Sequence, residues 1–368
     1  MEKFVYLPHH LMGKVFFLIS FILLYSGISR NKISFVFLSS LTGLVSGLSS
    51  PYPLFNLEIT LIIVIALSIL FYWQNKKRLV AIITDLSVFI LISSLSLVYY
   101  YFLQHSNFPW NSYLSWEKTV YVVKFSHLLL SLGPNFLFVL ISLPLMLKRI
   151  RLIDIFLLSW ILSPFIGILL LSRLNLLANV RYLSSSHFIP LGILAAFGIS
   201  HLTGIISAVV KVKKSIILSI LIIILSAIYI PDIYENLESQ IRAFTPYYYN
   251  QFLSKDLMSA FDYLNLNSPV NSVVLSQGFT SNLIPAYSHN KTVTGHPNFT
   301  FEFDMKNKEI AEFYKQNDGD FSRKFLYKYN VSYVFFGPDT PPADRVFLEK
   351  LSLKKFYSNR VVTILSAK

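Results

Sequence analysis

Long apolar stretches separated by short polar connections occupy most of the chain before residue 232. A helix that crosses a bilayer needs about 20 mostly apolar residues, and about eight stretches come close to this length. They cover residues 12–29, 33–50, 54–73, 79–102, 125–147, 153–172, 184–206 and 215–231. The pattern therefore predicts an α-helical polytopic membrane bundle of about eight transmembrane helices within residues 1–231.

One of these stretches contains residues that interrupt a helix. Gly133 and Pro134 lie inside the stretch 125–147. Proline lacks a backbone donor and glycine weakens helices, so kinks gather at such positions. We expect this span either to be kinked or to start as an interfacial helix.

The pattern changes after residue 231, where short β-branched strands alternate with amphipathic helices. The helices are expected at 254–267, 281–289, 303–316 and 320–330, and the strands at 272–276, 291–295, 331–337 and, as a final hairpin, 354–359 and 360–366. Strands that alternate with helices are typical of an α/β layer. Residues 232–368 are therefore predicted to form a small α/β domain with a partly parallel sheet.

Composition supports assignment to the membrane class. Hydrophobic residues make up 54% of the chain and charged residues 14%, whereas a soluble domain carries about 25% charged residues. The chain contains no cysteine. Disulfides and cysteine-based metal or redox sites are thereby excluded.

The formal net charge of +13 does not indicate nucleic-acid binding, because of where it lies. Residues 232–368 hold 15 basic and 14 acidic residues, so the excess belongs to residues 1–231. There the basic residues cluster in every second connection: Arg30 with Lys32, Lys76 to Arg78, Lys148 to Arg151, and Lys211 to Lys214. The positive-inside rule places such clusters in the cytoplasm. The pattern predicts a multi-pass protein of the cell membrane whose C-terminal domain is extracytoplasmic.

Acidic residues inside the apolar stretches are candidates for function, because they are costly in lipid. Glu58 lies near the outer end of its span, where it either lines an outward cavity or snorkels to the surface. Asp85 precedes a serine-rich segment and is expected to form an interhelical hydrogen bond. Asp154 is expected to pair with Arg151.

Two arginines lie in the outer connection before the seventh stretch. Arg181, which is followed by Tyr182, stands at the membrane boundary, and Arg173 lies earlier in the same connection. A guanidinium group can bind a phosphate through two hydrogen bonds. These residues are therefore candidates for binding a lipid phosphate, and the alternative is simple anchoring at the interface.

The histidines show no spacing typical of a metal site, so none is predicted. His296 follows Gly295 in the turn after the strand at 291–295. We expect Gly295 to permit a special backbone conformation at this turn. His296 is then either a packed, hydrogen-bonded turn residue or a ligand contact.

Two stretches, taken in order, carry a family resemblance. In WILSPFIGILLLSRLNLLANVRYLSSSHFIPLGILAAFGISHL (160–202), the matching residues are Trp160, Pro164, Arg181, Tyr182 and Pro190. In the C-terminal region they are Val293, Gly295, His296, Lys306 and the strand from Val334 to Pro338, while GLVSGLSSPYP (43–53) matches a span-to-loop turn. Together they resemble the GT-C-fold polytopic membrane glycosyltransferases, which include protein O-mannosyltransferases and the lipid A aminoarabinose transferase.

The resemblance implies a hexosyltransferase-type reaction. A sugar would pass from a polyprenyl-phosphate donor to a protein, lipid or glycan acceptor on the outer face of the membrane. Basic residues would hold the phosphate leaving group, which makes Arg181 the candidate here. A carboxylate serves the family as base or metal ligand, and no other cofactor is implied.

The family's catalytic carboxylate lies in the first outer loop, and the equivalent region would precede Met1. LPHH (7–10) is typical of a loop that enters a helix, and the acids expected on the outer side of the bundle are Glu2, Glu58 and Glu117. No residue is therefore assigned as the base. We expect the chain to match the later part of such an enzyme, with a separately encoded N-terminal half as a candidate partner.

A non-catalytic interpretation competes with this one. The chain would then be a membrane subunit or interaction protein whose outward domain binds a glycan or a partner. The absence of the catalytic loop favours it. A transporter is disfavoured, because intramembrane acids are few and no inverted repeat is evident.

Overall fold

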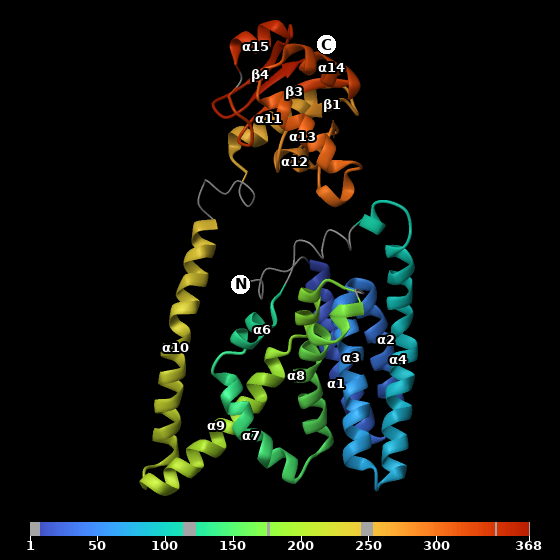
Figure 1. The fold of residues 1–368 in the computed structure, drawn as a ribbon, viewed down its shortest axis with the longest axis vertical. Helices are drawn as coiled ribbons and strands as arrows, with labels where there is room; N and C mark the ends of the chain where they lie inside the picture. Colours follow the sequence, from blue (N-terminus) through green and yellow to red (C-terminus); the bar gives the residue numbers. More distant parts are fainter. Residues whose placement is uncertain (1–7, 113–122, 175–176, 244–252, 343, 368) are drawn as a thin grey trace. The chain divides into compact units, whose positions relative to one another are not determined.

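The computed structural model describes residues 8–112, 123–174, 177–243, 253–342 and 344–367, and Figure 1 shows its fold. The chain divides into two compact units, Met1–Ile233 and Tyr234–Lys368. The first is built from helices and the second from a five-stranded sheet with helices.

The first unit is a bundle of apolar helices. Its helices are α1 (Pro8–Arg30), α2 (Ile33–Ser49), α3 (Pro51–Tyr72), α4 (Lys76–Gln104), α6 (Phe125–Ser131), α7 (Asn135–Lys148), α8 (Leu152–Leu169), α9 (Phe188–Val210) and α10 (Lys214–Ala243), with the short 3₁₀ helices η1 (Leu171–Leu174) and η2 (Asn179–Ser185) between α8 and α9. Among the described residues, six helices are long and apolar enough to cross a membrane: α1, α3, α4, α8, α9 and α10. This result makes a membrane bundle plausible.

Two of the eight predicted spans are shorter than expected. Helix α2 has 17 residues, and the stretch 125–147 is divided between α6 and α7, of which α7 has 14 residues. Gly133 lies at the break with a φ of 60°, and the Tyr229 hydroxyl would stand 3.0 Å from a Cβ at that position. A left-handed conformation followed by Pro134 ends the first helix, because neither residue continues it. The predicted interruption is therefore confirmed.

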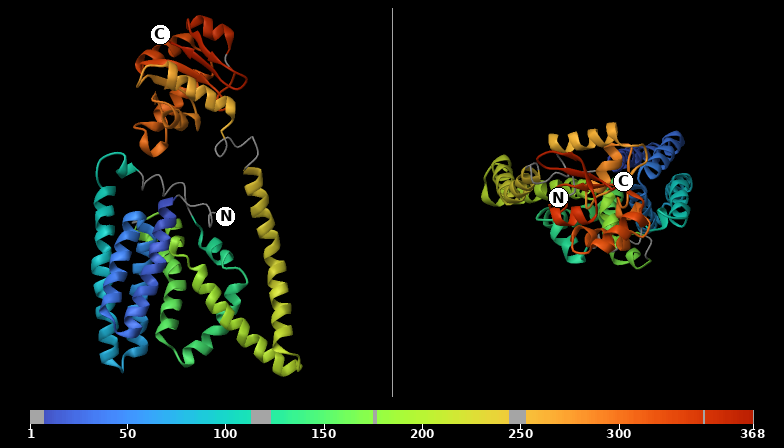
Figure 2. Two further views of the ribbon diagram at one scale, coloured as in Figure 1. Left: turned by 180° about the vertical axis from the view of Figure 1, so that it is seen from behind. Right: turned by 90° about the horizontal axis from the view of Figure 1, so that it is seen from above.

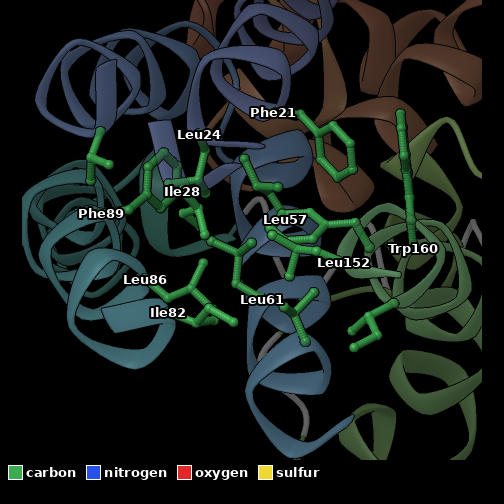
Figure 3. Packing of buried hydrophobic residues seen from close by; sticks show 14 of the residues in the cluster. Phe21, Leu24, Ile28, Leu57, Leu61, Ile82, Leu86, Phe89, Leu152 and Trp160 are labelled. Atoms are coloured by element: carbon green, nitrogen blue, oxygen red, sulfur yellow. The ribbon is translucent and has the colours of Figure 1, made fainter. Parts of the chain in front are cut away.

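The largest core of the bundle lies among α1, α2, α3, α4 and α8. Figure 3 shows Phe21 of α1 beside Trp160 of α8, and their ring centroids are 4.4 Å apart. Small residues bring the helices close: Ser46 of α2 donates from Oγ to the carbonyl oxygen of Gly13 in α1, at 2.8 Å. Association of apolar helices in lipid depends on such close packing, because lipid tails are as apolar as the side chains.

Helices α7 and α9 cross at Gly198, where a Cβ would overlap the carbonyl oxygen of Phe138. A backbone atom cannot rotate away, so Gly198→Leu is expected to force the helices apart and destabilise the bundle by about 1–3 kcal/mol. Thermal unfolding of the purified protein in detergent measures this loss. Gly192→Leu is the matched control, because Gly192 lies in the same helix with no atom within 4 Å of its Cβ position. An equal loss in both variants would contradict the proposed crossing.

The basic connections gather at one end of the bundle. The turns between α3 and α4, α7 and α8, and α9 and α10 lie together at the lower end in Figure 1, and Figure 2 shows the same arrangement from behind. These turns hold the clusters from Lys76, Lys148 and Lys211 onward. We call this the basic end of the bundle.

The second unit contains one mixed sheet. Its strands are β1 (Val273–Leu275), β2 (Lys291–Thr292), β3 (Val331–Phe336), β4 (Lys354–Ser358) and β5 (Thr363–Ser366), in the spatial order β2-β1-β3-β5-β4. β1 runs parallel to β2 and β3, whereas β5 is antiparallel to β3 and β4. The predicted partly parallel sheet and final hairpin are confirmed, although β2 is only two residues long.

Helices cover both faces of this sheet. α13 (Phe303–Tyr314), α14 (Gly319–Lys328) and α15 (Arg345–Lys350) contribute to one core, and α11 (Lys255–Asn267) and α12 (Thr280–Tyr287) to another. The hydroxyl of Tyr314 reaches into the sheet and donates to the carbonyl oxygen of Phe335 at 2.8 Å. Four of these helices match predicted segments, and α15 was not predicted.

Glu309 links α13 to α14. Its carboxylate accepts from Nζ of Lys328 at 2.7 Å and from the hydroxyl of Tyr329 at 2.7 Å. Burial acts to raise the pKa of Glu309, but the bonds from Lys328 and Tyr329 outweigh it and hold this pKa below its usual value of 4.5. Such a carboxylate stabilises the fold above its unfolded-state pKa, and the stabilisation is lost as the pH falls through the folded-state pKa.

We therefore expect Glu309→Gln to destabilise the second unit at neutral pH by less than about 1 kcal/mol, and by progressively less as the pH falls through the folded-state pKa of Glu309. Hydrogen exchange in the peptides of α13 and α14 measures the change. Glu312→Gln removes a more exposed ion pair with Lys315 from the same helix and serves as the control. A destabilisation by Glu309→Gln that stays constant down to strongly acidic pH would refute this role.

Candidate functional site

The candidate site lies at the end of the bundle opposite the basic end. It brings together the first turn of α1, the junction of α2 and α3, and η2. Ser50 is extended, with φ −159° and ψ 117°, and Pro51 occupies the first turn of α3. Proline is favoured there because the missing donor would have no helical partner. The sharp junction orients Tyr52 and Asn56, four residues apart, along one side of α3.

Arg181 is held by these two residues. Its guanidinium carbon lies 4.3 Å from the centre of the Tyr52 ring, which is a cation–π contact. Asn56 donates from Nδ2 to the carbonyl oxygen of Arg181 at 2.8 Å and to that of Tyr52 at 2.9 Å. Helix α3 therefore fixes both the backbone and the side chain of Arg181.

Basic groups from α1 face the same place. The Nδ1 atom of His10 lies 2.9 Å from the hydroxyl oxygen of Ser50, and the imidazole is within electrostatic range of Arg181, Lys14 and His9. His10, Lys14, Tyr52, Asn56 and Arg181 are called the Arg181 cluster below. Sequence reasoning missed its α1 members, because LPHH was interpreted as a loop. In the structure α1 begins at Pro8, so His9 and His10 lie in its first turn.

Tyr182, which directly follows Arg181, packs in the protein interior next to the cluster. Its side chain is fully buried, and a Cβ at Gly167 of α8 would overlap its ring. Burial raises the pKa of Tyr182 to about 12, so its hydroxyl is neutral. Within the described parts of the chain, that hydroxyl has no hydrogen-bond partner. The buried ring of Tyr182 positions η2, and its part in phosphate binding stays a prediction.

Glu58 and Arg173 are not brought to the cluster. The Oε1 atom of Glu58 accepts from the hydroxyls of Ser93 and Ser94 in α4, at 3.0 and 2.9 Å. In place of the two alternatives, an outward cavity or snorkelling to the surface, the Glu58 side chain forms a contact between α3 and α4. Ser93 and Ser94 belong to the serine-rich segment that follows Asp85. Arg173 lies in η1 with an exposed side chain.

Asp154 pairs with Arg151 as the sequence predicts. Its Oδ2 atom lies 3.0 Å from Nε of Arg151, and its Oδ1 atom lies 3.0 Å from Nη2. This pair belongs to the basic end and not to the Arg181 cluster. Glu2 and Glu117, the other acids expected on the outer side, lie outside the described residues.

The Gly295–His296 turn belongs to the second unit and has a local structural role. Nδ1 of His296 accepts from the backbone N–H of Asn298 at 3.2 Å, and this bond caps the short 3₁₀ helix η3 (Pro297–Phe299). Gly295 donates its N–H to the hydroxyl of Thr300 at 2.9 Å. The expectation of a special backbone conformation is wrong, because positive φ among described glycines occurs at Gly133 and Gly278 and not at Gly295.

The chemistry of the Arg181 cluster is cationic and aromatic. Across the described residues, no group of three His, Asp or Glu side chains could hold a metal ion. No protein-family model matches the chain, and no curated protein is significantly similar to it. The geometry can bind an anion, and a phosphate group fits the planar, multi-donor arginine. Glu58 lies two residues after Asn56. Its carboxylate accepts a hydrogen bond from Ser93 of α4, so it does not offer a base at the Arg181 cluster.

Proposed function

We propose that this chain is a GT-C-like membrane glycosyltransferase component that binds a polyprenyl-phosphate-linked sugar through the Arg181 cluster. In this proposal the cluster and the C-terminal domain lie on the extracytoplasmic side of a cell membrane. The transfer of the sugar to an acceptor, and the class of that acceptor, rest on the sequence resemblance.

The convergence of basic groups from α1 and η2 on one end of the bundle carries the proposal. The guanidinium carbon of Arg181 lies 4.3 Å from the centre of the Tyr52 ring, and a guanidinium group binds phosphate through its N–H donors. Lys14 adds positive charge within electrostatic range of His10, whose imidazole is a further hydrogen-bonding group of the cluster. A lipid phosphate bound there would leave its prenyl chain in the bilayer, because the cluster lies at the ends of apolar helices.

Catalysis would need a carboxylate in addition to this site. Of the acids described in the first unit, Glu58 binds serines and Asp154 binds Arg151, while Asp85 lies near Arg78 at the basic end and Asp232 lies in α10. The proposal therefore assigns the residues of the Arg181 cluster a donor-binding role only, whether the chain acts alone or as a non-catalytic subunit.

The proposal is tested by comparing a polyprenyl monophosphate with the corresponding polyprenol. The purified full chain is titrated with each lipid in detergent, and native mass spectrometry gives the dissociation constants. We expect the phosphate to tighten binding by at least about tenfold, because a charge-assisted hydrogen bond contributes about 1.5–3 kcal/mol. Equal affinity for the two lipids would overturn the proposal.

A further inference from the structure

A second feature of the first unit lies at the basic end and is separate from the Arg181 cluster. It is a groove of about 860 Å³ between the end of α7, the start of α8, the second half of α9 and the first residue of α10. Helices α7 and α9 cross at Gly198 and diverge toward this end (Figures 1 and 2). The groove lies where the two helices diverge, since α7 is followed by α8 and α9 by α10.

The rim of the groove is positively charged. Arg149 follows α7 with an exposed side chain, and Lys214 opens α10, where its Nζ donates to the hydroxyl of Ser200 at 3.1 Å. His201 lines the same rim. The acid in the groove, Asp154, has both carboxylate oxygens bonded to Arg151, so its charge is balanced. Among the described residues, Arg149 and Lys214 form no ion pair, and the rim therefore carries a net positive charge.

The walls of the groove are apolar. Leu145 and Met146 of α7 and Phe197 and Ile205 of α9 line it. Gly204 lines the same groove, and no atom stands within 4 Å of its Cβ position. An apolar channel of this kind accommodates a hydrocarbon chain, while its basic rim suits an anionic headgroup.

We propose that this groove binds an anionic phospholipid, with its phosphate at Arg149 and Lys214 and an acyl chain along α9 over Gly204. The positive-inside rule predicts that the basic end faces the cytoplasm. Anionic lipids are concentrated in that leaflet, and basic pockets between membrane helices on that side bind their headgroups. The site goes beyond the donor site proposed above and does not depend on it.

The test uses the full chain purified in detergent and native mass spectrometry with phosphatidylglycerol, phosphatidylcholine and the soluble headgroup glycerophosphoglycerol. The double variant Arg149→Ala/Lys214→Ala is expected to bind phosphatidylglycerol about thirty-fold more weakly, since each basic residue near a lipid surface contributes roughly a factor of five. Lys76→Ala/Lys77→Ala removes two exposed basic residues from the same end and is expected to change binding less than about twofold.

A separate variant tests whether an acyl chain occupies the groove. Gly204→Leu places a side chain in the groove and is expected to weaken phosphatidylglycerol binding about tenfold or more, because displaced CH₂ groups each contribute about 0.8 kcal/mol. Gly192→Leu adds the same side chain outside the groove and should leave binding unchanged. Both variants are compared at matched thermal stability, and the alanine double variant tests the site even if Gly204→Leu fails to fold.

Three results would overturn the proposal. The first is equal affinity of the wild-type protein for phosphatidylglycerol and phosphatidylcholine. The second is unchanged binding in the Arg149→Ala/Lys214→Ala variant. The third is full competition by glycerophosphoglycerol, which would indicate a site for a soluble anion. Selective phosphatidylglycerol binding that falls in the groove variants alone would support it.

Discussion

Arg181→Ala is expected to weaken binding of a polyprenyl monophosphate by about 10- to 100-fold, because a hydrogen bond to a charged group contributes about 1.5–3 kcal/mol. The substitution also removes the cation–π contact with Tyr52. Arg181→Lys keeps the charge but not the planar pair of donors, so it should recover only part of the loss. Dissociation constants measured on the purified full chain provide the comparison.

Arg173→Ala is the matched control for this prediction. Arg173 lies in the same connection between α8 and α9, but its side chain is exposed in η1. Its removal should change the affinity by less than about twofold, as expected for a screened surface charge. Equal losses in the two alanine variants would show that net charge, and not the geometry at Tyr52, accounts for binding.

Gly167→Ala is expected to impair the same site without touching the ligand. A Cβ at Gly167 would overlap the ring of Tyr182, which is fully buried and directly follows Arg181. Overpacking of this kind costs about 1–3 kcal/mol, and the displaced ring would move η2 away from Asn56. We expect a lower unfolding temperature and weaker binding of the polyprenyl monophosphate, by about tenfold.

A double-variant cycle distinguishes this mechanism from a general effect of the substitution. Tyr182→Ala removes the ring that the new methyl group would meet. In that background Gly167→Ala should add little further loss, because neighbouring changes that share one clash are not additive. Additive losses in stability and affinity would mean that Gly167 acts through another contact.

The element pattern was predictable where hydropathy or a strong breaker determines it. The apolar stretches became helices, and the interruption at Gly133 followed from a glycine–proline pair. The sheet of the second unit followed from short β-branched runs such as 331–337. The short helix α15 escaped prediction, because six residues are too few for helical periodicity to show.

The site was less predictable, because it depends on how helices rotate against one another. A span that is apolar all round does not reveal which face meets which neighbour. For this reason the sequence does not reveal that Glu58 faces Ser93 and Ser94 of α4. The contact between Asn56 and Arg181 joins residues 125 positions apart, and no local sequence pattern predicts it.

Photo-cross-linking tests the central claim most directly. A polyprenyl monophosphate that carries a photoreactive group on the isoprene unit nearest the phosphate is irradiated with the full chain in bilayer nanodiscs. Labelled peptides are then identified by mass spectrometry. We predict labelling in the first turn of α1, at the junction of α2 and α3, and in η2, with a strong decrease in Arg181→Ala. Absence of labelling in these three segments, or labelling there that is unaffected by Arg181→Ala, would contradict the account.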